Sequence, residues 1–398
     1  MRRRHFEALR PVCPVCRTHD SSFALRIAEA ACEENGHIVE GALHCTNANC
    51  LREFPIVDGI PLIVANIRQY VSENVLAIYG RKDLSSFVES MLGDCCGPGS
   101  MFDQTRQHLS SYAWDHYGDL DPEDAGKPGS GSGDQTSRLT PQPGPLPFEE
   151  RGRKDGGFGA QISAANPRPG SMLKNLEAGL ALAQPLAANG VVLDAGCSVG
   201  RGSFALAERC EELVLGVDLS FAMLRVASEV LRHGKVRYPR RRAGLVYERR
   251  EFSTDFVRQE NVDFWACDAA ALPFPDESFS LAVNMNLLDC VYSPRDLLVS
   301  LGRVLKTGGK MVLACPYDWS AAATPVEGWL GGHSQRSPAA GSCETVLRTL
   351  LTPKAHPGSV NTLRLIGECE NLPWHVRLHE RSTMTYKLHL VVAEKVGE

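Results

Sequence analysis

The sequence contains no long apolar run. Its first residues, MRRRHFEALRPVCPVC, carry positive charge with no apolar segment behind them, and no stretch of about 18 uninterrupted apolar residues occurs elsewhere. A secretory leader and a membrane-spanning helix are therefore not expected. We predict a cytoplasmic protein without a membrane partner.

An excess of positive charge is also missing. The 398 residues include 42 Lys and Arg against 47 Asp and Glu, for a formal net charge of -5. Proteins that bind nucleic acid over a broad surface are usually basic, so we expect no DNA partner and only local basic patches. The length suits a full-sized α/β domain with one small module.

The clearest motif is VVLDAGCSVGRGSFALA, at residues 191–207. An apolar β-branched run, typical of a buried strand, gives way to a turn with Gly196, Gly200 and Gly202 and then to a helical pattern. No Lys follows the last glycine, which excludes a P-loop, and the glycine spacing fits the G-x-G-x-x-G dinucleotide fingerprint poorly. The start of the helix would face an anionic or carboxylate-bearing ligand.

Strands and helices alternate after this turn. Asp218 ends a second strand, about 22 residues past Gly196, where a carboxylate suits a ribose diol. A third strand ends at Asp268, FSLAVNMNLLDCV is a fourth, and a helix over residues 297–305 with a Thr-Gly-Gly cap precedes a fifth, KMVLACPYDW. Two extended runs, WHVRLHER and TYKLHLVVAEKV, close the chain. The pattern predicts an open, mostly parallel sheet that binds ligands at the carboxyl ends of its strands.

Four segments, VLDAGCSVGRG, GVDLSFAMLRVA, CDAAALPFPDESFSLAV and RVLKTGGKMVL, resemble in order the motifs of class I S-adenosylmethionine-dependent methyltransferases. The resemblance implies a Rossmann-like α/β domain over residues 171–398, with a mostly parallel sheet, an antiparallel final strand and S-adenosylmethionine as cofactor. A scaffold that binds the cofactor without turnover is the alternative. The implied cofactor residues are Asp194, Gly196, Cys197 and Gly200 along the methionine part, Asp218 at the ribose, Leu219, Asp268 and Ala269 around adenine, and Asn286 and Leu287 beside the sulfonium.

Two of the cysteine pairs stand out among 14 cysteines. Cys13 and Cys16 form a C-x-x-C pair, Cys45 and Cys50 a second pair, and four thiolates can close a tetrahedral structural zinc site. A ribbon without metal, or a redox pair at Cys13 and Cys16, is the alternative. The segments CPVC, HCTNANC and EFPIVDGIPLIV resemble the Trm112-like zinc-ribbon family, with a wider second pair. The resemblance implies that residues 10–65 form a zinc module of the kind that activates methyltransferases.

Two segments lie between the module and the catalytic domain. Residues 66–119 carry helical spacing, and we expect a connector or a lid over the active site, with Tyr112, Trp114 and Tyr117 as aromatic candidates. Residues 120–170 are dominated by Pro, Gly, Ser and charged residues, which predicts a flexible linker.

A finer resemblance concerns the methyl acceptor. FALA, NLLDCVYSP and CPYDWSAAATPVEGWLGG are similar to the methyltransferase domain of ovothiol synthases, which methylates an imidazole nitrogen of a thiohistidine, and more distantly to carnosine N-methyltransferases. The chain lacks the iron-dependent portion of ovothiol synthases, so the acceptor stays open. The implied acceptor pocket comprises Tyr317, Asp318, Trp319 and Trp329, with Asp289 and Tyr292 opposite; the catalytic candidates are Asp289, Tyr317 and Trp319.

An insertion at residues 232–250, RHGKVRYPRRRAGLVYERR, is crowded with arginine. It is either a solvated charged excursion or a contact for RNA phosphates. The sequence therefore leaves two kinds of acceptor open: a small imidazole- or amine-containing metabolite, which we favour, and an RNA or a protein that also uses the zinc module.

Overall fold

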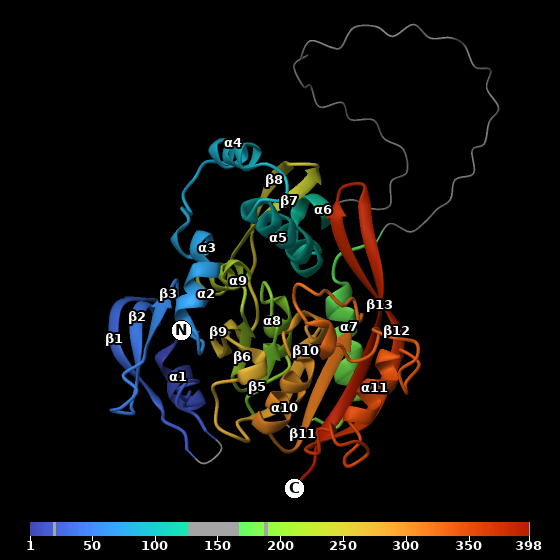
Figure 1. Cartoon of the computed structure of the whole chain (residues 1–398). Coiled ribbons are helices and arrows are strands. Elements are labelled where there is room, and N and C mark those ends of the chain that lie inside the picture. The colour runs from blue at the N-terminus through green and yellow to red at the C-terminus, as the bar shows by residue number, and fades with distance from the viewer. Residues whose placement is uncertain (19–20, 126–166, 187–189, 398) are drawn as a thin grey trace, which may run out of the picture.

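The computed structural model describes residues 1–18, 21–125, 167–186 and 190–397 (Figure 1). Most of the predicted linker, residues 126–166, lies outside the described residues. The helices are α1 Arg3–Leu9, α2 Ile67–Glu73, α3 Val75–Tyr79, α4 Ser86–Cys96, α5 Met101–Tyr117, α6 Pro122–Ala125, α7 Ser171–Leu182, α8 Arg201–Ala207, α9 Phe221–His233, α10 Pro294–Val304 and α11 Cys343–Leu350. The strands are β1 Leu25–Glu34, β2 His37–Cys45, β3 Glu53–Val57, β4 Ile60–Ile63, β5 Val192–Ala195, β6 Val214–Asp218, β7 Lys235–Ala243, β8 Val246–Ser253, β9 Val262–Cys267, β10 Phe279–Met285, β11 Leu305–Cys315, β12 Leu363–His379 and β13 Ser382–Lys395.

One large sheet organises the molecule, with strand order β1-β2-β3-β4-β9-β6-β5-β10-β11-β13-β12. Strands β9, β6, β5, β10 and β11 run parallel, and β13 is antiparallel to β11. The predicted Rossmann-like α/β sheet with an antiparallel final strand is thereby confirmed. Helices α7, α8 and α9 pack in the core on one face, and α1, α10 and α11 pack on the other. Because both faces are covered, every residue of β5 is buried.

One boundary differs from the sequence prediction. Helix α10 begins at Pro294 and ends at Val304, and β11 starts directly at Leu305. Residues Thr307 to Gly309, predicted as a helix cap, therefore lie within the strand, and Gly308 has a φ of 79° there. Two consecutive glycines are typical of a turn, so the sequence did not indicate that the strand starts before them.

The N-terminal segment, through β1–β4, shares the large sheet of the α/β domain. Its hairpin β3–β4 turns at Asp58 and Gly59, as the sequence indicated, and β4 then pairs in parallel with β9 through Leu62 opposite Ala266 and Ile63 opposite Cys267. The Arg2 backbone N–H also donates to the Asp263 carboxylate at 2.8 Å. The module is thus joined to the edge of the sheet by backbone pairing as well as by side chains.

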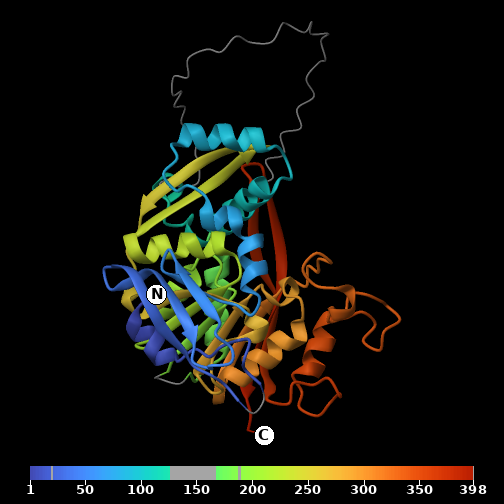
Figure 2. The ribbon, with the colours of Figure 1, turned by 60° about the vertical axis from the view of Figure 1, so that its left-hand side comes forward.

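Above the carboxyl ends of the parallel strands lies a cap, which we define as α4, α5 and the hairpin β7–β8 (Figure 1). Figure 2 shows α4 lying across the two strands of that hairpin, with which it is in contact. Helix α5 contacts both β7 and β12. The cap therefore combines segments from the N-terminal half of the chain and from the predicted insertion, and it contacts the last hairpin through α5.

A buried carboxylate holds α5 in place. Asp115 accepts hydrogen bonds from the Ser171 backbone N–H and hydroxyl at 2.9 Å each, from the Met172 N–H at 3.2 Å and from the Trp374 indole at 3.1 Å. Burial raises the pKa of Asp115 although these bonds favour the charged form. One side chain thus connects α5 to the start of α7 and to β12.

The arginine-rich insertion forms the hairpin β7–β8, and most of its arginines pair with acidic residues of the cap and its surroundings. Arg250 donates to Asp121 at 2.7 Å, Arg249 to Glu89 at 3.0 Å, and Arg242 to Glu380 at 3.0 Å. These charges link the hairpin to neighbouring segments. Among the residues that the structure describes, no helix has the length and apolar character needed to cross a membrane.

Candidate functional site

A cavity of about 800 Å³ lies at the carboxyl ends of β5, β6, β9 and β10, beneath α5. Nine of the ten predicted cofactor residues line it, and Gly200 does not. The nine are Asp194, Gly196, Cys197, Asp218, Leu219, Asp268, Ala269, Asn286 and Leu287. The carboxyl ends of neighbouring parallel strands meet at one edge, which is why residues far apart in the sequence gather there.

Gly200 has a packing role that the sequence did not distinguish from ligand contact. Its φ is 89°, and a Cβ at this position would lie 2.6 Å from the Phe264 ring and 2.8 Å from the Ala227 methyl group. Only glycine allows α8 to start so close to β9 and α9. The packing of α8 thus requires glycine at this position, and a contact of Gly200 with the methionine part of the cofactor stays a prediction.

Asp218 ends β6 and organises the glycine turn. Its carboxylate accepts hydrogen bonds from the Ser198 N–H at 2.9 Å and from the Ser220 N–H at 2.8 Å. Burial raises its pKa, while these backbone bonds act in the opposite direction. The carboxylate is thus held in a fixed position on the cavity wall.

Asp194 is the most deeply placed carboxylate of the cavity, with 4% of its surface exposed. Burial raises its pKa to about 6; the hydroxyl of Ser203, which donates to it at 2.7 Å, lowers the pKa, and the charge of Asp218 raises it further. At neutral pH the folded protein therefore carries a poorly solvated charge here.

We expect Asp194→Asn to stabilise the ligand-free protein above pH 7 by about 2–3 kcal/mol, the equivalent of a rise in pKa from about 4 to about 6. An acid whose pKa is higher in the folded state destabilises the fold once it ionises, so wild-type stability should fall as the pH rises from about 4 to 6. The amide variant should lack that slope, because an amide does not ionise in this pH range. Ser203 can still donate its hydrogen bond to the amide oxygen, so the local contact is kept.

Urea unfolding of both proteins at several pH values from 4 to 8 measures this difference. The exposed Asp276→Asn is the control, and it should leave the slope of the wild type in place. Equal stability of wild type and Asp194→Asn at every pH would contradict the expected burial cost.

Two buried oxygen atoms of the cavity lining have no hydrogen-bond partner among the described residues. They are Ser198 Oγ, in the glycine turn, and Asn286 Oδ1, just after β10. Asp268 follows β9 and accepts a hydrogen bond from the Ala270 N–H at 2.9 Å. Because buried polar atoms normally find partners, the two free oxygens suit a polar ligand such as a nucleoside or an amino acid.

The three catalytic candidates are not among the residues that line the cavity, and their place in an acceptor pocket stays a prediction. The Asp289 carboxylate accepts from the Asp318 N–H at 2.7 Å, the Tyr317 hydroxyl lies 2.7 Å from His389 Nδ1, and the Trp319 indole donates to Cys343 Sγ at 3.3 Å. Trp319 also stacks on Trp329, with ring centres 6.0 Å apart. These contacts hold together the segment after β11, whereas Tyr292 lines the cavity and is 78% exposed at its mouth.

Helix α5 contributes lining residues that the sequence interpretation only partly foresaw. Of its three aromatic candidates, Tyr112 lines the cavity, while Trp114 and Tyr117 are buried in the core. The Tyr117 hydroxyl donates to the Val199 carbonyl at 2.7 Å and so supports the glycine turn. His108 and His116 were missed, although they lie four residues on either side of Tyr112 and this spacing was a usable signal.

The four predicted zinc ligands come together in the N-terminal module. The Sγ atoms of Cys13, Cys16, Cys45 and Cys50 all lie within 4.8 Å of one another. The Cys13–Cys50 and Cys16–Cys45 separations are 3.9 and 3.8 Å. A tetrahedral zinc with bonds of about 2.3 Å places its sulfur ligands about 3.8 Å apart, so the arrangement fits this metal.

The segment around Cys13 also contacts the loop that follows Asp268. Next to Cys13, the Val12 N–H donates to the Pro273 carbonyl at 2.9 Å, and Arg17 donates to the Leu272 carbonyl at 2.6 Å. Both acceptors belong to the loop that follows Asp268. The module is therefore in direct contact with the loop that borders the predicted adenine site.

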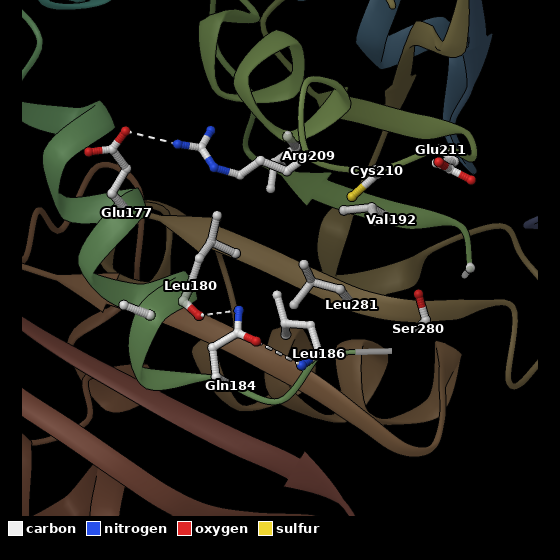
Figure 3. Close-up of a pocket in the computed structure, with 13 residues that line it drawn as sticks. Glu177, Leu180, Gln184, Leu186, Val192, Arg209, Cys210, Glu211, Ser280 and Leu281 are labelled. Carbon is white, nitrogen blue, oxygen red and sulfur yellow. Dashed lines mark hydrogen bonds and ion pairs between the residues drawn. The ribbon is translucent and has the colours of Figure 1, made fainter. Parts of the chain in front are cut away.

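A second cavity, of about 550 Å³, lies at the opposite ends of β5 and β10 (Figure 3). Figure 3 shows Glu177 and Arg209 on one side of it, paired at 2.9 Å, and Leu186 and Ser280 on another. None of the predicted site residues lines it.

Comparison with known proteins agrees with the geometry of the first cavity. Residues 193–313 match the family model described as "Methyltransferase domain". Phosphoethanolamine N-methyltransferase 1 of Arabidopsis thaliana is 28% identical over 123 residues, which is 31% of this chain and 20% of that protein. Malonyl-[acyl-carrier protein] O-methyltransferase of a Marinomonas species is 31% identical over 140 residues, which is 35% of this chain and 42% of that protein. The chain thus spans less than half of the length of these relatives.

A solved structure of an S-adenosylmethionine-dependent methyltransferase from Methanosarcina mazei aligns with 54% of this chain and 95% of its own, at 22% identity and a TM-score of 0.35.

Proposed function

We propose that the protein transfers a methyl group from S-adenosylmethionine to a nitrogen of a small imidazole- or amine-containing metabolite. The match of residues 193–313 to a methyltransferase domain supports the reaction type. The observation that carries the proposal is the cavity at the carboxyl ends of the strands, where nine of the implied cofactor residues meet. Its volume of about 800 Å³ lies in the upper part of the usual range for ligand sites, so a second small molecule has room.

The residues of the cavity have distinct roles in this proposal. Asp218 accepts hydrogen bonds from the ribose hydroxyls, and Asp268 and Ala269 contact the edge of adenine. Asp194, Gly196 and Cys197 border the methionine part, and the remaining three, Leu219, Asn286 and Leu287, flank adenine and the sulfonium. Ser198 Oγ and Asn286 Oδ1, both without a partner in the described part of the chain, gain hydrogen bonds from the ligand.

When bound, S-adenosylmethionine supplies a methyl group that its sulfonium has already activated. The chain then has to hold the acceptor nitrogen in line with that methyl group and exclude water, and such orientation accounts for much of the rate. A base is needed only if the nitrogen carries a proton when it attacks. The proposal therefore requires an oriented acceptor and no nucleophilic side chain.

A small acceptor is favoured over RNA by the ion pairs of the hairpin β7–β8. Arg242, Arg249 and Arg250 pair with carboxylates of this chain, so their charges are partly neutralised before any phosphate could bind. The resemblance of the segments after β10 and β11 to ovothiol synthases supports an imidazole nitrogen as acceptor.

We also propose that residues 10–65 are a Trm112-like zinc module that supports the catalytic domain within the same chain. The tetrahedral grouping of the four cysteines supports the zinc, and the pairing of β4 with β9 supports the close attachment. The hydrogen bonds to the Leu272 and Pro273 carbonyls join the module to the loop that follows Asp268, which is how it would support the cofactor site.

Calorimetry with S-adenosylhomocysteine, followed by transfer of labelled methyl groups to histidine-like metabolites, amines and total RNA, tests the proposed function. We expect micromolar binding of the nucleoside and label in a small molecule. Absence of binding would overturn the proposal, label found in RNA alone would overturn the choice of acceptor, and binding without transfer to any acceptor would favour a non-catalytic module.

A further inference from the structure

The cavity extends beyond the implied cofactor residues to one face of α5. His108, Tyr112 and His116 are spaced four residues apart, which places them on one side of a helix. His108 is exposed, Tyr112 is half-buried and His116 is 6% exposed. At about 1.5 Å of rise per residue, this row of three side chains runs about 12 Å from the mouth of the cavity to its floor.

The cavity lining is acidic. None of the lining residues, all of which the structure describes, is Lys or Arg, whereas four of them are aspartates: Asp194, Asp218, Asp268 and Asp296. A concave site lined by charges of one sign repels ligands of that sign, and the effect is stronger where water is excluded. No lining side chain offers a permanent positive charge to a phosphate or carboxylate.

His116 adds a neutral polar atom at the floor. Its Nδ1 is buried and has no hydrogen-bond partner in the described parts of the chain. Burial lowers the pKa of His116 to about 3, and the charge of Arg201 behind it acts in the same direction. The imidazole is therefore neutral at physiological pH, and it can exchange hydrogen bonds with a ligand without neutralising an anion.

The aromatic ring of the row, Tyr112, lies near a second ring from β12. Tyr112 and Trp374 have ring centres 6.3 Å apart, and both line the cavity. Trp374 is held by its hydrogen bond to Asp115 and by stacking on Tyr386 at 5.1 Å, so its ring cannot turn freely. Aromatic faces attract cations and flat heterocycles, and they offer nothing to an anion.

We propose that this face of α5 selects the methyl acceptor by charge, admitting a neutral or cationic amine or nitrogen heterocycle and rejecting acceptors with a phosphate or carboxylate near the reacting nitrogen. The acceptor donates a hydrogen bond to His116 and lies against Tyr112 and Trp374. The inference rests on the proposed function, because it assigns the remaining part of the cavity to the acceptor.

Matched pairs of ligands test the proposal. Ethanolamine and phosphoethanolamine differ by one phosphate, and histamine and histidine by one carboxylate. Calorimetry on the protein saturated with S-adenosylhomocysteine should give dissociation constants about 100-fold lower for the member without the anion, because an uncompensated buried charge is costly.

Variants identify the row as the selecting surface. His116→Asn and Tyr112→Leu should each weaken binding of the preferred ligands about tenfold while S-adenosylhomocysteine binds within about twofold of wild type. His108→Arg, which adds a cation at the mouth, should narrow the difference within each pair. His233→Gln, at an exposed position at the end of α9, is the control. It should change neither the affinity for the preferred ligands nor the difference within each pair.

The outcomes separate this inference from the proposed function. If S-adenosylhomocysteine does not bind, the proposed function fails and the inference fails with it. If it binds, but the anionic member of each pair binds as well as its partner or no member binds, only the inference is overturned. Unchanged selectivity in all three α5 variants, with melting curves like that of the wild type, would also overturn it.

Discussion

Replacement of Asp218 by alanine is expected to lower the affinity for S-adenosylhomocysteine about 100-fold. Its carboxylate lies on the cavity wall, where it is proposed to accept the two ribose hydroxyls. Hydrogen bonds to a charged group contribute about 1.5–3 kcal/mol each, and about 1.4 kcal/mol is a factor of ten in affinity. Loss of one to two such bonds therefore accounts for the expected effect, which calorimetry measures directly.

The same substitution affects the ligand-free protein in two opposite ways. The N–H groups of Ser198 and Ser220 lose their acceptor, but a buried carboxylate whose pKa is raised by burial is removed. We therefore expect a small change in the melting temperature without ligand and loss of most of the upward shift that S-adenosylhomocysteine produces in wild type. Asp94→Ala, at an exposed position of α4, serves as control. Wild-type affinity in Asp218→Ala would contradict the ribose assignment.

Cys45→Ser is expected to remove one zinc ion per chain and to lower the melting temperature by about 10 °C or more. Structural zinc sites have apparent binding free energies of about 10–16 kcal/mol, and each 1 kcal/mol of stability shifts the melting temperature by about 2–4 °C in domains of this size. Elemental analysis of the purified protein and thermal melting with and without a strong chelator provide the measurement. Chelation of wild type should reproduce the variant.

The exposed Cys96 is the matched control for this experiment. Cys96→Ser should keep the zinc content and the melting temperature of wild type. Wild-type protein that contains no zinc, and that instead forms a reversible disulfide between Cys13 and Cys16, would contradict the zinc assignment in favour of a redox pair.

The structure of the N-terminal module could be predicted from the sequence only in part. The hairpin around Asp58 and Gly59 was predictable, because the turn residues and the apolar runs on either side are local features. The pairing of β4 with β9 was not predictable, because their partner residues are about 200 positions apart and any apolar strand could occupy that edge. The burial of all four residues of β4 follows from this contact.

The two sides of the cavity differ in the same way. The gathering of Asp194, Asp218 and Asp268 at one cavity could be predicted, because each comes at the end of a buried strand and parallel strand ends meet at one edge. On the acceptor side, the direction of Tyr317 and Trp319 depended on how the chain turns after β11, where Tyr317 has a φ of 56°. The sequence therefore offered these aromatic residues as candidates without showing that they do not line the cavity.

The sequence by itself determined the sheet, the methyl-donor motifs and the four cysteines of the module, because these depend on periodicity and on spacing over short distances. Only the tertiary structure decided which face of α5 meets the cavity. That orientation depends on Asp115, which accepts hydrogen bonds from Ser171 and Trp374, more than 50 and 250 positions away. This packing brings the face of α5 with His108, Tyr112 and His116 to the cavity, so the spacing of these residues could not by itself show what they line.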